Sequence, residues 1–233
     1  MLRLTAEEIL EGNVFLLDKP ITWTSFDLVK KVKNILRRTY GFKKLKVGHA
    51  GTLDPLASGL LIVCTGRATK KINEWQELDK TYVAELELGK TTPSFDLETE
   101  VDGTYPTAHI TKELFEQTLT GFVGENKQVP PLFSAKWVDG TRAYRHARLG
   151  KNIELKANTI FIKKLDCIEF SPPKAVIYIH CSKGTYIRSL ARDIGTTLNS
   201  GAYLSALRRE KIGKFSVNDA YSIEDFENIF NSM

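Results

Sequence analysis

The feature that most constrains the fold is an irregular loop that runs directly into an apolar segment. The loop contains Gly48, Gly51, Pro55 and Gly59, which favour turns and backbone conformations that a Cβ atom would forbid. The apolar segment, residues 60–64, has the sequence Leu-Leu-Ile-Val-Cys and predicts a buried strand. Residues 46–64 therefore predict a turn-rich loop held against the centre of a sheet.

Asp54 is the one acidic residue in this stretch, and its neighbours are apolar or small. A carboxylate in such a setting either accepts hydrogen bonds from backbone N–H groups or carries out chemistry. Spacing alone favours a turn, because Asp, Pro and Gly cluster in turns far more often than in active sites. Both interpretations of Asp54 remain open at this level.

The remaining periodicities predict an α+β fold. A helix is expected over about 26–38, where apolar residues recur at helical spacing, and residues 80–89 alternate as in a half-buried strand. Further strands are expected over 159–168 and 175–182, and further helices with caps at Thr111, Thr185 and Ser222. Because helices and strands do not alternate one for one, we expect a mixed, largely antiparallel central sheet flanked by helices, not a doubly wound fold.

Composition excludes several classes of protein. The 233 residues fit one large domain, residues 1–233, with an inserted lobe at about 104–160. No run of about 18 apolar residues is present, so we expect no membrane span and no membrane partner. Acids near the start argue against a signal peptide, and three scattered cysteines fit a reducing cytoplasm without disulfides. The histidines show no paired spacing and there is no Cys-x-x-Cys, so no metal site is expected.

Two stretches favour a nucleic-acid partner. Residues 30–46 contain eight Lys or Arg and no acid, whereas a solvated helix face normally mixes signs. Residues 128–148 interleave aromatic and basic side chains, a pattern that suits unstacked RNA bases and their phosphates. The net charge of +5 agrees, although a basic surface also serves solubility alone.

The run Gly-His-Ala-Gly-Thr-Leu-Asp-Pro-Leu-Ala-Ser-Gly-Leu-Leu, residues 48–61, resembles the signature of the TruB family of tRNA pseudouridine synthases. The resemblance continues over almost the whole chain. It implies the pseudouridine synthase fold, with Asp54 as the catalytic carboxylate, and isomerisation of uridine 55 in the tRNA T-arm. Many bacterial relatives continue into a small C-terminal RNA-binding PUA domain, and we expect no complete one here.

The resemblance also implies roles for other residues. In the Asp-Lys-Pro motif, Lys19 would brace the catalytic loop, and in Lys-x-Tyr, Tyr82 would stack on the target base. The run Lys-Gly-Thr-Tyr-Ile-Arg ends in Arg188, which pairs with the catalytic Asp in the family, here Asp54. Arg188 also falls in a first helical turn, where the helix dipole disfavours a cation, so it needs an anionic partner. We expect Arg188→Met to be nearly as harmful as Asp54→Asn.

Five further residues are expected to bind substrate. His49 would occupy space near flipped nucleotides, while the backbones of Tyr186 and Leu207 would read the uracil edge. Without the family, His49 could equally be a loop histidine and Leu207 a core residue. Lys136 and Arg142 lie in a segment that resembles the family, but many members have Lys where this chain has Trp137, so the lysine is shifted by one place.

The chemistry implied by the family needs no redox step and no energy input, so we expect no cofactor. A carboxylate near ribose C1′ would either attack C1′ or take a proton from C2′, and the sequence does not choose between them. We expect a monomer that acts on the T-arm in the cytoplasm without a protein partner. Two alternatives stay open: a non-catalytic RNA-binding or RNA-folding protein, and a guide-RNA-dependent pseudouridine synthase subunit.

Overall fold

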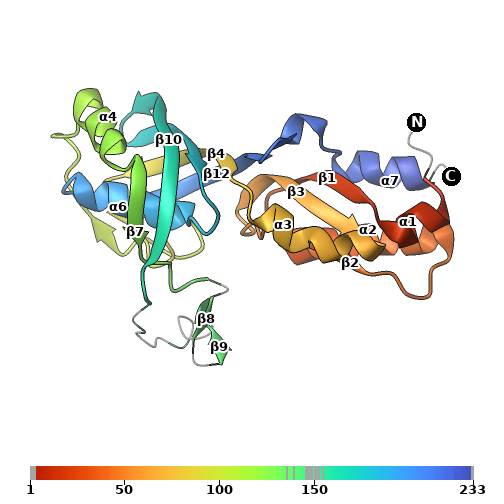
Figure 1. Cartoon of the computed structure of the whole chain (residues 1–233). Helices are drawn as coiled ribbons and strands as arrows, with labels where there is room; N and C mark the ends of the chain where they lie inside the picture. The colour runs from red at the N-terminus through yellow and green to blue at the C-terminus, as the bar shows by residue number, and fades with distance from the viewer. Residues whose placement is uncertain are drawn as a thin grey trace. The chain divides into compact units, whose positions relative to one another are not determined.

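The computed structural model describes residues 4–134, 136–138, 140–144, 149, 153 and 155–231 (Figure 1). The chain forms two compact units. Unit 1 comprises Met1–Tyr82 and Leu207–Met233, and unit 2 comprises Val83–Ala206. Strands β4 (Lys80–Leu88) and β12 (Ala202–Ile212) contribute residues to both, because the unit boundaries fall within them.

The sheet of unit 1 is organised around β3, Ala57–Thr65, the strand predicted from the apolar run. It pairs antiparallel with β1 (Val14–Lys19) and β2 (Val47–Ala50), and parallel with residues 207–209 of β12. Strand β13 (Phe215–Ser216) extends β12 as an antiparallel neighbour. The strand next to the Asp54 loop is therefore paired along both edges, which fixes the position of the loop's end.

Helices complete unit 1. They are α1 (Ala6–Gly12), α2 (Ser25–Tyr40), the short η1 (Gly66–Lys71), α3 (Ile72–Gln76) and η2 (Val217–Asp219), and α7 (Ile223–Asn231). Helix α2 begins with a capping box between Thr24 and Asp27 and ends at Gly41, whose φ is +68°. Its apolar stripe packs into a core with Phe15, Phe226 and other residues of β1, β3 and α7. The helical periodicity of α2 thus predicted its buried face.

Unit 2 is built on a sheet with the strand order β12, β4, β11 (Lys174–Cys181), β10 (Asn158–Ser171), β7 (Gly124–Gln128). Strand β10 pairs antiparallel with both β11 and β7. Helices α4 (Lys112–Gly121) and α6 (Ile187–Thr197) belong to this unit. So do two small hairpins, β5 (Lys90–Thr91) with β6 (Gly103–Thr104) and β8 (Trp137–Val138) with β9 (Thr141–Arg142).

The predicted fold class is confirmed: the protein is α+β with a mixed, largely antiparallel sheet. The predicted caps at Thr111 and Ser222 are also present. The predicted cap at Thr185 is wrong. Helix α6 has Tyr186 at its N-cap, without a side-chain bond, because the Thr185 hydroxyl instead donates to the carbonyl of Ser182 at 3.0 Å.

Residues 104–160, expected to form an inserted lobe, lie inside unit 2. That they form a separate lobe stays a prediction. Across the part of the chain that the structure describes, every helix is too short or too polar to cross a membrane.

Candidate active site

Asp54 lies in unit 1, in the loop between β2 and β3, and its side chain is half-buried. Both neighbours of Asp54 are held from the segment that leads into α2. The Ser25 hydroxyl accepts from the N–H of Leu53 at 2.8 Å and lies 3.1 Å from its carbonyl oxygen. The N–H of Thr22 donates to the carbonyl of Pro55 at 2.7 Å. These bonds fix the backbone on each side of Asp54 and so restrict the position of its carboxylate.

Lys19 holds residues 20–23, the turn before α2, in place. It is the last residue of β1, it is fully buried, and its ammonium donates to the carbonyls of Pro20, at 2.9 Å, and Trp23. Burial lowers the pKa of Lys19 to about 8, while the charge of Asp54 acts to raise it. Lys19 therefore supports the turn before α2 and contributes to the electrostatic field at Asp54.

Tyr82 stands at the start of β4 and is 8% exposed. Its side chain acts electrostatically on the guanidinium of Arg209 and favours the charged form of that group; the sequence analysis did not single out Arg209. Arg209 is 1% exposed, and the charge of Asp54 acts to raise the pKa of its guanidinium. The structure thus joins Asp54, Tyr82 and Lys19 electrostatically through Arg209, all within unit 1.

A signal for Arg209 existed in the sequence. Arg208 and Arg209 are adjacent, and neighbouring side chains on a strand point to opposite faces. One of the two therefore had to point into the protein once this segment formed a strand. No strand is assigned to this segment from the sequence, so the buried arginine is missed.

His49 and Leu207 lie close to the same loop along the strands. His49 is in β2, opposite Val63, and among the described residues its Nδ1 atom is buried without a hydrogen-bond partner. Burial, followed by the charge of Arg209, lowers the pKa of His49, so the imidazole is neutral at pH 7. Leu207 is half-buried on β12, opposite Ala57 at the end of the loop.

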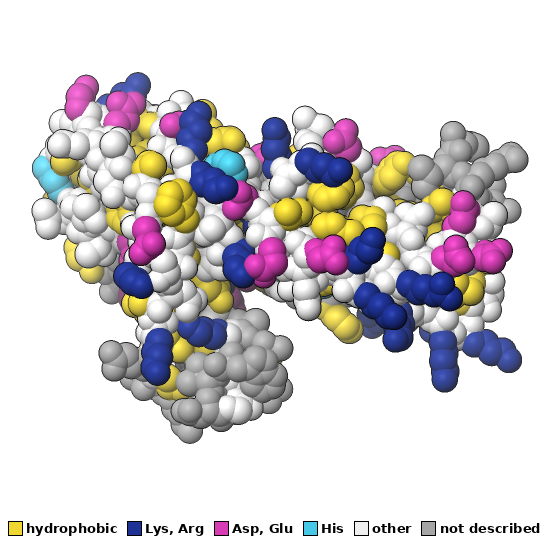
Figure 2. Space-filling model, viewed as in Figure 1, with side chains coloured by type: hydrophobic (Ala, Val, Ile, Leu, Met, Phe, Trp, Pro, Cys, Tyr) yellow, Lys and Arg dark blue, Asp and Glu magenta, His cyan; other side chains and the backbone are white. Residues whose placement is uncertain are grey.

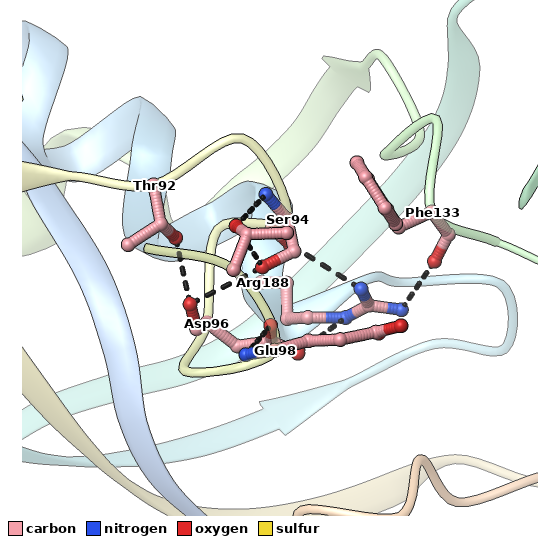
Figure 3. A network of polar contacts seen from close by, with 7 residues as sticks. Thr92, Ser94, Asp96, Glu98, Phe133 and Arg188 are labelled. Atoms are coloured by element: carbon pink, nitrogen blue, oxygen red, sulfur yellow. Dashed lines mark hydrogen bonds and ion pairs between the residues drawn. The ribbon is translucent and has the colours of Figure 1, made fainter. Parts of the chain in front are cut away.

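Arg188 belongs to unit 2, in the first turn of α6, and is 4% exposed (Figure 3). Its guanidinium donates to the carbonyls of Phe133 at 2.9 Å and Ser94 at 3.3 Å, and its Nε lies 3.5 Å from a carboxylate oxygen of Asp96. The anionic partner that its place near the helix N-terminus demands is therefore supplied by Asp96 within unit 2. The expected pairing of Arg188 with Asp54 stays a prediction.

Asp96 was another residue that sequence reasoning missed as part of a site. It is 5% exposed, and its carboxylate also accepts from the N–H of Glu98 at 2.9 Å. Thr92 and Ser94 donate to its backbone carbonyl at 2.7 and 3.2 Å, so the whole turn is tied down (Figure 3). No element or role is assigned to residues 91–103 from the sequence, so Asp96 is not identified there.

Three of the expected substrate-binding residues lie in unit 2. The N–H of Tyr186 donates to the Gln128 side chain at 2.8 Å, and its carbonyl accepts from that amide at 3.1 Å. Lys136 donates to the carbonyl of Lys156 at 3.2 Å and to Asn158 at 3.1 Å. The backbone of Arg142 lies in β9, but its side chain is outside the described part. Their contacts with substrate stay predictions.

The basic stretch at 30–46 forms a surface on α2 and the loop that follows it. Its exposed members are Lys30, Arg37, Arg38, Lys43, Lys44 and Lys46. Figure 2 shows Lys and Arg side chains gathered along the lower edge of unit 1. Glu227 of α7 pairs with Lys31 and Arg38, at 2.5 and 3.0 Å, so α7 offsets part of the charge.

Among the described residues, no group of His, Cys, Asp or Glu is placed to hold a metal ion.

Comparisons with known proteins cover nearly the whole chain. A family model described as the TruB family pseudouridylate synthase (N terminal domain) matches residues 37–187, and one described as the tRNA pseudouridylate synthase B C-terminal domain matches residues 188–232. The tRNA pseudouridine synthase B of Phocaeicola vulgatus is 55% identical over 216 residues, which are 93% of this chain and 92% of that protein. The tRNA pseudouridine synthase B of Flavobacterium johnsoniae is 50% identical, and the match covers 96% of this chain and 98% of that protein.

Solved structures give the same fold. A chain of a Cbf5-Nop10-Gar1 complex matches with a TM-score of 0.74 and 28% identity, covering 97% of this chain and 56% of that chain. A chain of the archaeal box H/ACA sRNP Nop10-Cbf5 complex matches with a TM-score of 0.71 and 25% identity. That match covers 98% of this chain and 57% of the other chain. The protein therefore spans little more than half of those two chains. With family models matching both parts of its sequence, this chain belongs to the TruB family of pseudouridylate synthases.

Proposed function

We propose that this protein is a tRNA pseudouridine synthase that isomerises uridine 55 in the T-arm. The observation that carries the proposal is the position of Asp54. Its carboxylate lies in a loop whose backbone is fixed on both sides, beside the cations Lys19 and Arg209. The family signature and relatives that carry the name tRNA pseudouridine synthase B support the substrate.

The reaction breaks the bond between ribose C1′ and uracil N1, turns the base, and forms the bond from C1′ to C5. N1 gains a proton and C5 loses one, so atoms and charge balance without a redox partner. Asp54 either attacks C1′ or removes a proton from C2′. The target uridine has to leave the stack to reach this carboxylate, and Tyr82 would then stack on the flipped base.

Lys19 and Arg209 would hold Asp54 in place and favour its ionised form, since neighbouring cations stabilise a carboxylate. His49 and Leu207 would contact the flipped nucleotides from β2 and β12. The basic surface on α2 and the loop after it would attract the tRNA backbone. Lys136, Arg142 and Tyr186 would contact the RNA from unit 2.

We further propose that the protein acts as a monomer in the cytoplasm, without a protein partner or guide RNA. The solved chains from Cbf5 complexes extend well beyond the matched region, whereas the tRNA pseudouridine synthase B proteins of Phocaeicola vulgatus and Flavobacterium johnsoniae match along more than nine-tenths of their length. This difference favours the tRNA enzyme over a guide-RNA-dependent subunit.

The test uses the purified chain and a bare T-arm hairpin. Isomerisation does not change mass, so the product is detected by pseudouridine-specific chemical labelling. We expect the parent to convert the uridine, Asp54→Asn to bind the hairpin without converting it, and the exposed Asp219→Asn control to match the parent.

Two results would contradict the proposal. Tight binding of the hairpin by the parent without conversion would support a non-catalytic RNA-binding protein. Conversion only after a guide RNA and partner proteins are added would support the guide-dependent alternative.

A further inference from the structure

Strand β12 places two neighbouring arginines in opposite surroundings. Arg208 is partly exposed and forms a two-pronged pair with the carboxylate of Asp18, at 2.7 and 3.1 Å. Arg209 points to the other face, is 1% exposed, and stands opposite Gly59 of β3 in the parallel ladder. Burying a guanidinium is costly unless its donors are satisfied, so its contacts indicate why the strand keeps it there.

The contacts of Arg209 converge on the loop that carries Asp54. Its Nε donates to the carbonyl of Leu60 at 2.8 Å, one Nη donates to Gly51 at 3.0 Å, and the other donates to Thr52 at 3.4 Å. Gly51 and Thr52 begin the loop, whereas Leu60 belongs to β3, the strand that follows it. One rigid, planar group therefore ties the start of the loop to the next strand, and Asp54 lies between the two attachments in the sequence.

The remaining surroundings of Arg209 are the reactive side chains. The side chain of Tyr82 and the charge of Asp54 both act electrostatically on its guanidinium and favour the charged form. Neutral carbonyls cannot balance a buried positive charge, and Asp54 is the acid whose charge acts on Arg209. The same cation thus interacts electrostatically with the phenol and the carboxylate, and it fixes the backbone around the loop that carries Asp54.

Building on the proposed function, we propose that Arg209 is the positioning residue of this active site, which holds Asp54 and Tyr82 in register with each other. It acts through these two side chains and does not touch the substrate. Gly59 allows this arrangement, because a Cβ atom there would lie 2.3 Å from the Arg209 carbonyl oxygen and push β12 away from β3. A lysine would keep the charge of Arg209 but lose the planar fork.

The test compares Arg209→Met and Arg209→Lys with Arg208→Met, a matched control on the same strand with a surface ion pair. Single-turnover rates are measured with saturating T-arm hairpin from pH 5 to 9, hairpin affinity is measured by filter binding, and folding is checked by circular dichroism. We expect Arg209→Met to lose about 100-fold in rate, as displacing reactive groups by about 1 Å does. Arg209→Lys should recover part of that loss, and Arg208→Met should match the parent.

The pH profile separates positioning from a purely structural role. Asp54 would lose a neighbouring cation in Arg209→Met and keep Lys19, so the acidic limb of the rate should move to higher pH, by about one unit. In Arg209→Lys the limb should stay near that of the parent. Hairpin affinity should change less than about threefold in each variant, because Arg209 lies beneath the site.

Three outcomes would overturn the proposal. The first is a folded Arg209→Met with the parent's rate and pH profile. The second is a loss that appears only in affinity. The third is an unfolded Arg209→Lys, which would make Arg209 a folding element. Each is judged against the parent's own conversion of the hairpin, so failure of the parent to convert uridine would reject the proposed function separately.

Discussion

Replacing Gly59 with alanine tests how closely β3 and β12 pack beneath the Asp54 loop. Gly59 has a φ of +105°, and an added Cβ atom would lie 2.3 Å from the carbonyl oxygen and 2.7 Å from the nitrogen of Arg209. Both are backbone atoms, so no side chain can rotate away and the strands must separate. Gly41→Ala is the matched control, because Gly41 also has a positive φ, +68°, but among the described residues no atom beyond its chain neighbours lies within 4 Å of the added Cβ.

Alanine at position 41 carries the cost of a left-handed conformation, about 1–2 kcal/mol, and alanine at position 59, whose φ lies beyond that region, carries at least as much. Gly59→Ala adds the cost of overpacking, about 1–3 kcal/mol. We therefore expect its free energy of unfolding to fall by about 2 kcal/mol more than that of Gly41→Ala. With an m-value of about 4 kcal/mol/M, this is a difference of about 0.5 M in the guanidinium chloride midpoint.

Tryptophan fluorescence and circular dichroism would follow the unfolding of both variants. Equal midpoints for Gly59→Ala and Gly41→Ala would refute the close contact between β3 and β12. We also expect Gly59→Ala to lower the single-turnover rate on the hairpin, since β12 carries Arg209, whereas Gly41→Ala should keep the rate of the parent.

Three further predictions concern unit 1. Burial lowers the pKa of Lys19 from 10.5 to about 8. Between these two pH values the unfolded chain binds more protons than the folded chain. The free energy of unfolding of the parent, relative to that of Lys19→Met, should therefore rise from pH 8 to 10.5. Denaturant unfolding at each pH measures this, and a difference that falls with pH would contradict it. Phe226→Ala should cost about 3–5 kcal/mol, because the ring is fully buried at 5.1 Å from Phe15; a loss under about 1 kcal/mol would show that the core collapses around the gap. Thr24→Ala removes a capping box and should lower the free energy of unfolding by about 1 kcal/mol, with no loss if the cap at α2 is not formed.

Much of the fold could be predicted because its signals are local. The periodicity of α2 identified the helix and its buried face, and Ser222 identified the start of α7. The apolar run identified β3 as a buried strand. Thr185 failed as a cap because a hydroxyl can donate to a nearby carbonyl as readily as it accepts from a helix N–H, and the turn before α6 favoured the former.

The partners of buried charges could not be predicted in the same way. The sequence indicated that Arg188 needs an anion, but Asp96 lies 92 residues earlier and is brought close by the hairpin and α6. Charge requirements are local, whereas the identity of the neighbour depends on how distant segments pack.

The sequence alone determined several elements of this protein, among them α2 and β3, its family and the loop that carries Asp54, because periodicity, caps and a long motif are properties of neighbouring residues. Only the tertiary structure decided that Arg209, and not Arg208, enters the core and ties Gly51, Thr52 and Leu60 together. Strand alternation requires that two adjacent arginines face opposite ways. Which face is covered depends on the loop and strands that pack there, and those come from the other end of the chain.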